Sequence, residues 1–310
     1  MTIFKGTFGL ACLLAASHTS WAMEGEIEEL IIVDRLFEDT TVVSPTSKIE
    51  AKDLQSINLL TTEDAVAFEP SLVIRRRYVG DPNGTMGIRG SGMFQTARSM
   101  VFSDGLPLHY LLQTRWSGAP RWSLVAPGEI DNVEVIYGPF SAAYGGNSMG
   151  GVVNIKTRIP EERLFVLQGT LMGQNYDVLA TNETFGGSQW FASYEDRWDD
   201  FSIYATYNHF DNKSQPMSNY MLAPNEGSGQ SLEDLTTDLD NRGIKGYFQG
   251  QNDRSGKGVY IGDSGSETSI SDLYKIKLGY DFGELQLRGT IAYEDRERKE
   301  DDKKNYLRDI

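Results

Sequence analysis

The C-terminal half of the chain alternates apolar and polar residues over long stretches. In LYKIKLGYDFGELQLRGTIAY, a turn at Gly283-Glu284 separates two runs whose apolar face recurs at every second position: Tyr274, Ile276, Leu278 and Tyr280, then Leu287, Gly289, Ile291 and Tyr293. The segment FSIYATYNHF, residues 201–210, alternates in the same way. A period of two residues predicts β-strands with one apolar and one polar face. A soluble β-sandwich and a membrane β-barrel would both produce this pattern.

The alternation alone favours the sandwich, but strand length and loop length shift the balance toward the barrel. The strands run to about ten residues or more, as a tilted membrane strand requires. The short turn at Asp199-Asp200 contrasts with a long polar insert from Asp211 to Ser271, and short turns at one rim with long loops at the other are typical of outer-membrane barrels. Five strands are predicted, at residues 162–173, 184–196, 200–211, 271–282 and 285–296.

Residues 46–160 have a different texture, in which short apolar runs alternate with turn signals. TTEDAVAFEPSL predicts a short helix, because Thr61 or Thr62 can cap it, Glu63 and Asp64 occupy its first turn, and Pro70 ends it. Strand-like runs follow this helix: LVIRR from Leu72, MGIRG from Met86, SMVFSDG from Ser99, NVEVIYG from Asn132 and GGVVNIKTR from Gly150. Together these elements predict a compact domain of mixed helix and strand.

The stretch NVEVIYGPFSAAYGGNSMGGVVNI, residues 132–155, is unusually rich in glycine. A phosphate-binding loop is disfavoured, since Gly145-Gly146 is followed by Asn147-Ser148-Met149 without a lysine. A simple turn accounts for Gly138-Pro139 but poorly for two separate Gly-Gly pairs. The remaining interpretation is close backbone approach, in which side chains are absent because the segment lies against another surface.

The N-terminus resembles a secretory signal. Lys5 precedes an apolar run from Thr7 to Ala16, and the small-residue ending Ser20 to Ala22 predicts cleavage after Ala22. The run is too short to span a bilayer. In the segment that follows, residues 23–45, the sequence ELIIVDR from Glu29 to Arg35 is strand-like. It is either a strand that adds to the sheet edge of another protein or the first strand of the following domain.

Charge and reactive residues exclude several functions. The chain has 29 basic and 44 acidic residues; removing the signal takes away one lysine and leaves a formal net charge of −16, which disfavours nucleic acid as a partner. The single cysteine, Cys12, lies in the signal, so the exported residues offer no thiol. Beyond the signal the histidines are His109 and His209, in different predicted domains, and no catalytic triad or zinc-ligand spacing is present. Enzymatic activity is disfavoured.

A family resemblance rests on several of these motifs taken in order. Four motifs, taken in order, resemble the plug domain of TonB-dependent outer-membrane receptors. They are TTEDAVAFEPSLVIRR, GIRGSG, VFSDGLPL and NVEVIYGPFSAAYGGNSMGGVVNIKTR. The resemblance implies an α+β plug domain followed by an antiparallel transmembrane β-barrel. Its domains would be a signal peptide at residues 1–22, a periplasmic segment at 23–45, the plug at 46–160 and the first part of the barrel at 161–310.

The barrel is expected to be incomplete. The family implies about twenty-two strands, which need about 220 residues even without loops, whereas 150 residues follow the plug. The charged ending EDRERKEDDKKNYLRDI also lacks the aromatic final strand of the family. We interpret the sequence as a fragment of a longer receptor or as the product of an interrupted reading frame.

The resemblance also assigns roles to residues near the N-terminus and in the plug. The TonB box corresponds to Glu29, Leu30, Ile31, Ile32, Val33 and Asp34, which would pair with the inner-membrane protein TonB by strand addition. Arg89 and Glu134 resemble charged plug residues that form ion pairs facing the barrel wall. The alternative for these two is a surface salt bridge of little consequence.

The ligand would bind at the apical loops of the plug. The candidate residues are aromatic or polar and lie in three loops: Arg77, Tyr78 and Asp81; Phe94 and Gln95; Tyr110, Gln113, Trp116 and Trp122. By family analogy the ligand is a ferric siderophore or other iron complex. A carbohydrate or cobalamin-like ligand is the alternative within the family, and a secreted carbohydrate-binding protein is the alternative outside it. No cofactor is expected; the expected partners are TonB, outer-membrane lipid and the extracellular ligand.

Overall fold

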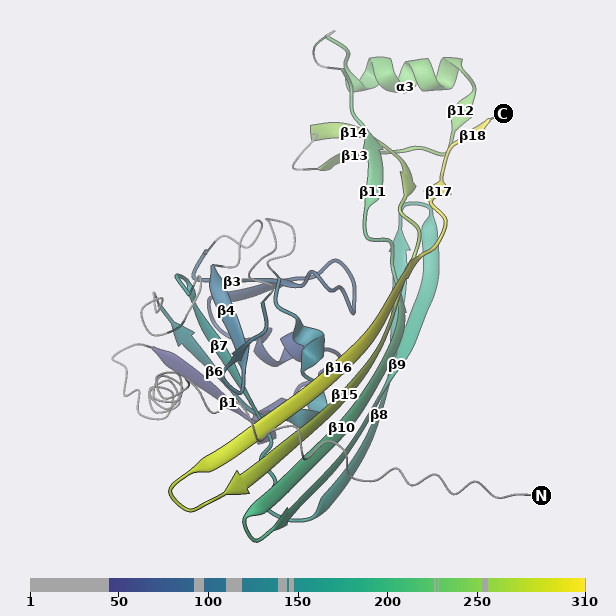
Figure 1. Ribbon diagram of the computed structural model, residues 1–310. Coiled ribbons are helices and arrows are strands. Elements are labelled where there is room, and N and C mark those ends of the chain that lie inside the picture. The colour runs from purple at the N-terminus through teal and green to yellow at the C-terminus, as the bar shows by residue number, and fades with distance from the viewer. Residues whose placement is uncertain are drawn as a thin grey trace, which may run out of the picture. The chain divides into compact units, whose positions relative to one another are not determined.

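Figure 1 shows a computed structural model of the chain. The structure describes residues 45–91, 98–109, 119–138, 144, 148–225, 227, 229–252 and 256–309. The predicted signal and the predicted TonB box, Glu29 to Asp34, lie outside the described residues. The described part begins with a small domain of mixed sheet and short helices and continues into long antiparallel strands.

The small domain is built on a mixed five-stranded sheet. Its strands are β1 (Thr46–Glu50), β4 (Ser99–Ser103), β5 (Leu106–Pro107), β6 (Ile130–Tyr137) and β7 (Gly151–Thr157). They are arranged in the order β1-β6-β7-β4-β5. The β4–β7 pair is parallel and the others are antiparallel. β1 is therefore an edge strand, which pairs with β6 at one side of the sheet.

Short helices and a second, two-stranded sheet cover this sheet. Helix α2 (Ala51–Leu54) follows β1, and β2 (Leu72–Arg75) pairs with β3 (Thr85–Ile88). The 3₁₀ helices are η1 (Thr62–Val66), η2 (Trp122–Leu124) and η3 (Pro127–Glu129). The predicted helix in TTEDAVAFEPSL is confirmed as η1, where the Asp64 carboxylate accepts from the backbone N–H of Thr61 at 2.9 Å.

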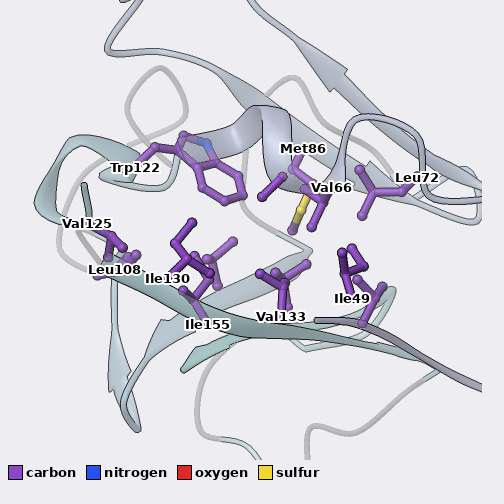
Figure 2. Packing of buried hydrophobic residues seen from close by; sticks show 14 of the residues in the cluster. Ile49, Val66, Leu72, Met86, Leu108, Trp122, Val125, Ile130, Val133 and Ile155 are labelled. Atoms are coloured by element: carbon purple, nitrogen blue, oxygen red, sulfur yellow. The ribbon is translucent and has the colours of Figure 1, made fainter. Parts of the chain in front are cut away.

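Apolar side chains from both layers form the core of the domain. Figure 2 shows Ile49, Val133 and Ile155 on the sheet facing Val66 and Trp122 on the opposite layer. Val133 is fully buried, and Val66 and Ile155 are almost so. Alternate residues of a strand point to the same face, so Val133 and Val135 of β6 and Val153 and Ile155 of β7 all reach this core.

The second half of the described chain is a sheet of long strands. They are β8 (Leu164–Val178), β9 (Thr181–Trp198), β10 (Phe201–Ser214), β15 (Glu267–Asp281) and β16 (Gln286–Glu300). Their order is β16-β15-β10-β9-β8, and every neighbouring pair is antiparallel. Among the described strands, β8 and β16 remain the two edges, so the sheet is open and the barrel incomplete.

The two faces of this sheet differ as the alternation predicts. Tyr274 on β15 lies opposite Tyr293 on β16, and Ile276 lies opposite Ile291, so the apolar residues share one face. That face is exposed: Ile291 is 74% accessible, and Leu171 on β8 is 81% accessible. No second described sheet covers it, which rejects the sandwich interpretation and leaves a surface suited to lipid. The turns at Asp199-Asp200 and Gly283-Glu284 are both confirmed.

The predicted strands were too short at the end facing the long insert. β10 continues to Ser214 and β15 already begins at Glu267, whereas the predictions placed these boundaries near residues 211 and 271. The polar residues there had suggested a loop, but they continue the ladder, as in the pair Ser214 and Glu267. Backbone pairing with a neighbouring strand outweighs the low strand propensity of these side chains.

The long insert between β10 and β15 has its own small fold. It contains β11 (Asn219–Leu222), helix α3 (Leu232–Asn241), β12 (Ile244–Lys245), β13 (Phe248–Asn252) and β14 (Gly256–Asp263). Two strand pieces that follow β16 complete it, since β17 (Lys304–Asn305) pairs with β14 and β18 (Arg308–Asp309) pairs with β12. Among the described residues, no helix is both long enough and apolar enough to cross a membrane.

Candidate functional site

The polar face of the long sheet lies against the small domain, and this contact is the candidate functional site. Lys275 on β15 extends its ammonium group to the Glu129 carboxylate, with 2.6 Å between Nζ and Oε1. Lys277, two residues further on the same face, binds Asp104 at 2.8 Å. Phe191 of β9 and Leu273 of β15 pack with Ala126 of the small domain. The small domain is therefore docked on the sheet by charged, polar and apolar contacts.

The predicted ligand loop with Arg77, Tyr78 and Asp81 takes part in this docking. The Asp81 carboxylate is fully buried and accepts from the Arg77 guanidinium at 2.8 Å on each oxygen. It also accepts from the backbone N–H groups of Arg77 and Asn83. Burial alone would raise the pKa of Asp81, but these donors, Arg77 first, hold it below its ordinary value. The ion pair thus fixes the conformation of the loop.

Side chains of the sheet hold the backbone of the same loop. Gln215 donates to the carbonyl of Arg77 at 2.8 Å. Asn212 and Ser214 both donate to the carbonyl of Val79 at 3.2 Å. The carbonyl of Gly80 accepts from Ser269 and from the Arg296 guanidinium. Because backbone carbonyls are the acceptors, this docking depends little on the side chains of the loop.

Two guanidinium groups lie near the ring of Tyr78. Arg77 and Arg298, the latter on β16, lie 5.9 and 6.0 Å from the centroid of its ring. The Arg298 guanidinium is bound in turn to the buried Glu267 carboxylate at 3.0 Å. Burial raises the pKa of Tyr78 to about 12, and its hydroxyl finds no hydrogen-bond partner within the described part of the chain. Tyr78 and Asp81 are therefore packed away from solvent, while Arg77 keeps a third of its side chain exposed.

The other predicted ligand residues divide into two groups. Trp122 is 5% exposed, belongs to the core and donates its indole N–H to the carbonyl of Gly84 at 3.0 Å. This position gives it a structural role in the described fold. The remaining candidates lie outside the described residues: Phe94, Gln95, Tyr110, Gln113 and Trp116.

Arg89 and Glu134 were predicted to form ion pairs facing the barrel wall. In the described residues, the two contacts observed for them are not with the long strands of the barrel sheet. The Arg89 guanidinium lies over the Tyr137 ring, 5.2 Å from its centroid. The Glu134 carboxylate lies 3.6 Å from the ammonium of Lys156 on the neighbouring strand β7. Both contacts are internal to the small domain, so ion pairing of Arg89 and Glu134 with a barrel wall stays a prediction.

The ion pairs with Lys275 and Lys277 were missed by the sequence reasoning. The available signal was two lysines on the lumen-facing side of β15, in a strand whose other face is apolar. Such lysines are unremarkable in a water-filled lumen, but a buried one requires a carboxylate partner. Lys275 is 6% exposed and Glu129 is fully buried at the side chain.

The two Gly-Gly pairs of residues 132–155 suggested that the backbone lies close to another surface. The structure shows such close approach to the long sheet at two other glycines, Gly80 and Gly128. A Cβ on Gly128 would lie 2.5 Å from the Phe191 ring, and one on Gly80 would lie 2.7 Å from the Phe210 ring. These two glycines let the small domain approach the sheet. In the pair Gly150-Gly151, the near neighbours are instead Ser91, Ser99 and the Ile136 carbonyl of the small domain itself. Gly145 and Gly146 lie outside the described residues.

A small cavity of ≈ 50 Å³ lies between the domain and the sheet. The domain contributes Thr62, Glu63 and Trp122, and the sheet contributes Asn208 and Arg296. Its volume is sufficient for water, and its polar lining offers hydrogen-bond partners. Burial raises the pKa of Glu63 above its ordinary value. The contact between domain and sheet is thus partly polar at its centre.

A mixed domain docked on the polar face of an antiparallel sheet, with an apolar outer face, defines a plug-and-barrel membrane protein. Residues 38–152 match the TonB-dependent Receptor Plug Domain family. This part of the chain is therefore a TonB-dependent receptor plug domain, and an open antiparallel sheet of long strands follows it.

Solved structures show the same fold at low identity. The siderophore receptor PirA from Acinetobacter baumannii is 16% identical, with a TM-score of 0.54 over 86% of this chain and 33% of that one. A mutant of the ferric enterobactin receptor PfeA from Pseudomonas aeruginosa is 16% identical, with a TM-score of 0.56 over 84% and 34%. The ferric yersiniabactin uptake receptor FyuA from Yersinia pestis is 13% identical, with a TM-score of 0.51 over 83% and 41%. The chain spans about a third of the length of the first two.

Proposed function

We propose that this chain is the plug and first barrel strands of an outer-membrane receptor that imports a scarce ligand with energy from TonB. The observation that carries the proposal is a plug-family domain docked on the polar face of a sheet whose opposite face is exposed and apolar. This arrangement supports a transport protein rather than an enzyme. The outer membrane would be its location.

Energy coupling is assigned to Glu29 to Asp34. The segment is strand-like, and it precedes β1, the edge strand with which the described plug begins. A partner that adds a strand to this segment can therefore pull directly on the plug. In strand addition the backbone supplies the hydrogen bonds, so the side chains contribute less than the backbone does.

The ligand is proposed to be a ferric siderophore or another iron complex. Support comes from the solved relatives, which are described as siderophore, ferric enterobactin and ferric yersiniabactin receptors. Among the predicted ligand residues that the structure describes, Arg77 keeps a third of its side chain exposed, and a cationic side chain suits an anionic chelate. Asp81, through its ion pair, and Tyr78, through its ring, would hold the Arg77 side chain in position.

The test is ligand-dependent growth of a strain that carries the complete gene and lacks its own receptor. Ile31→Pro removes a backbone N–H from the predicted strand and should abolish growth on the ferric siderophore as sole iron source. Ile31→Ala keeps the backbone donor and should retain growth. Equal growth of the Ile31→Pro strain would reject the energy-coupling role. Growth dependence on a sugar or a cobalamin, with none on iron complexes, would reject the siderophore.

A further inference from the structure

The residues that follow β16 run across the small fold of the long insert. We call residues 301–309 the strap. Its two strand pieces, β17 and β18, pair with β14 and β12 (Figure 1), and the backbone N–H of Tyr306 donates to the carbonyl of Ile261 at 2.9 Å. The ring of Tyr306 also meets the ring of Phe248 edge-on, with 5.9 Å between the two centroids. The strap is therefore packed into the insert by its backbone and by a side chain.

The insert is shaped to receive the strap. Three of its glycines lie so close to the strap that a Cβ on any one of them would collide with a backbone carbonyl oxygen. The pairs are Gly246 with Tyr306, Gly262 with Lys304, and Gly265 with Asp301. Gly246 and Gly265 also have positive φ angles, which other residues rarely adopt. Larger side chains at these positions would push the strap away, so the insert and the strap are complementary in shape.

A buried carboxylate joins the insert and the strap to a third segment. Asp263, at the end of β14, accepts on Oδ2 from the Tyr306 hydroxyl at 2.7 Å and from the Thr181 hydroxyl at 2.6 Å. Its Oδ1 accepts from the backbone N–H of Gly265 at 2.8 Å. Thr181 is the first residue of β9 and directly follows the turn after β8. The donors to this one carboxylate thus come from the β8–β9 connection, the insert and the strap.

Separation of these three segments would be costly. Asp263 is fully buried, and Thr181 and Tyr306 are 1% and 5% exposed. A buried carboxylate that loses its donors keeps the penalty of its burial without compensation. Burial, together with the bond to Asp263, raises the pKa of Tyr306 to about 12, so its hydroxyl stays a donor at neutral pH. The bonds to Asp263 therefore hold the three segments in one arrangement.

We propose that these three segments form one body, the loop unit, which keeps its internal arrangement while the receptor binds and imports its ligand. The loop unit comprises residues 179–183, the described part of the insert and the strap. Connections that open readily have few buried contacts, whereas opening here must break two strand pairs and expose a charge at once. Ligand entry then requires movement of the whole loop unit or of other connections. Only this transport step rests on the proposed function.

Hydrogen exchange in the complete receptor tests whether the three segments open together. Tyr306→Phe removes one donor to Asp263 and should speed amide exchange about ten-fold in the strap, in β14 and at the start of β9 alike, as the loss of one hydrogen bond to a carboxylate implies. Tyr247→Phe is the matched control, because its hydroxyl donates to the exposed Asp240 within the insert at 2.9 Å. It should leave exchange in the strap and at the start of β9 unchanged.

The exchange pattern decides the inference without any ligand. A change in Tyr306→Phe that is confined to the strap, or no change at all, would overturn the loop unit, since the start of β9 would then open independently. The same response at β9 to Tyr247→Phe would also overturn it, because the effect would not depend on the buried carboxylate.

Cross-linking tests whether the loop unit stays together during import. The only cysteine among the 310 residues, Cys12, lies in the predicted signal, so introduced thiols can be linked selectively. Lys245→Cys with Arg308→Cys places thiols on directly paired residues of β12 and β18. Glu183→Cys with Lys304→Cys replaces an exposed ion pair between β9 and the strap, to be joined by a short, reducible bis-thiol linker.

Both linked receptors should take up iron at the rate of their unlinked forms, measured with the ferric siderophore on which the complete receptor supports growth. Loss of uptake on linking, with recovery on reduction, would overturn the inference, because the linked segments would then have to separate. Absence of uptake before linking would count against the proposed function instead, and the exchange measurement would then decide the inference alone.

Discussion

At the scale of single residues, the contact between plug and sheet depends on a few charges placed where water is excluded. Asp81 shows how such a charge is kept: its carboxylate is fully buried, yet it accepts bonds from the Arg77 guanidinium and from two backbone N–H groups. A hydrogen bond to a charged group contributes about 1.5–3 kcal/mol, more than a neutral one. Removing the charge should therefore loosen the apical loop.

Acidification should weaken this loop through Asp81. Its pKa in the folded chain is below the ordinary value of about 3.9. The stabilisation is thus fully present above pH ~4 and is lost as the pH falls through the lower folded value. We expect Asp81→Asn to lower the stability of the detergent-solubilised chain at neutral pH by about 2 kcal/mol. The difference from the unaltered chain should shrink in acid.

Urea unfolding at a series of pH values measures this difference. Asp177→Asn, at an exposed position of β8, is the control and should leave the profile unchanged. A difference between Asp81→Asn and the unaltered chain that grew as the pH fell would contradict the assignment, because protonation of Asp81 removes the stabilisation and cannot add to it.

At the scale of elements, the helical turn η3 approaches β9 closely enough to require glycine. A Cβ on Gly128 would lie 2.5 Å from Cδ1 of Phe191 and 2.8 Å from Oε1 of Gln168. Phe191 is itself held by Leu273 and Ala126, so it has little freedom to move away. The position of η3 against β9 is therefore set by the absence of a single side chain.

Gly128→Ala should destabilise the docked plug by about 1–3 kcal/mol, because overpacking forces neighbouring side chains from their preferred positions. Phe191→Leu in the same chain should recover part of the loss by making room. Gly289→Ala on β16 is the control, since a Cβ there meets no atom within 4 Å. Thermal unfolding in detergent measures all three. Equal effects of Gly128→Ala and Gly289→Ala would show that the close approach has no energetic weight.

Sequence reasoning predicted the elements with a strong local period and missed those formed by distant contacts. Tyr274 and Ile291 lie on the predicted face because period-two alternation is a local property of a strand. Helix α3 was missed in the polar insert, although Ser231 caps it and Leu235 and Leu239 follow at helical spacing. No local pattern joins Lys275 to Glu129, which are 146 positions apart. The candidate site was therefore predicted less completely than the fold.

At the scale of the whole described molecule, one sheet separates two environments. Its inner face carries the charged and polar groups that dock the plug, such as Lys275 and Arg296. Its outer face exposes large apolar residues, such as Leu171 and Ile291. A contiguous apolar surface of this kind is unusual on a water-soluble protein and suits a hydrocarbon environment. The two faces thus place the plug on the lumen side.

A charge on the outer face should impair membrane insertion in the complete receptor. Leu171→Arg, near the middle of β8, should cost about 2–4 kcal/mol when that strand lies in lipid. Thr170→Arg, the adjacent residue on the opposite face of the strand, is the control and should be tolerated. Unfolding in lipid vesicles measures the free energies. Equal tolerance of both substitutions would contradict the assignment of the outer face to lipid.

The small fold of the long insert is completed from elsewhere in the chain. Helix α3 and strands β11 to β14 precede β15 and β16, yet β17 and β18 supply partners for β14 and β12 from beyond residue 300. In the chain, those partners come after the β15–β16 hairpin. The fold of the insert can therefore close only when this hairpin has taken its place, which makes the insert a late-forming, long-range part of the structure.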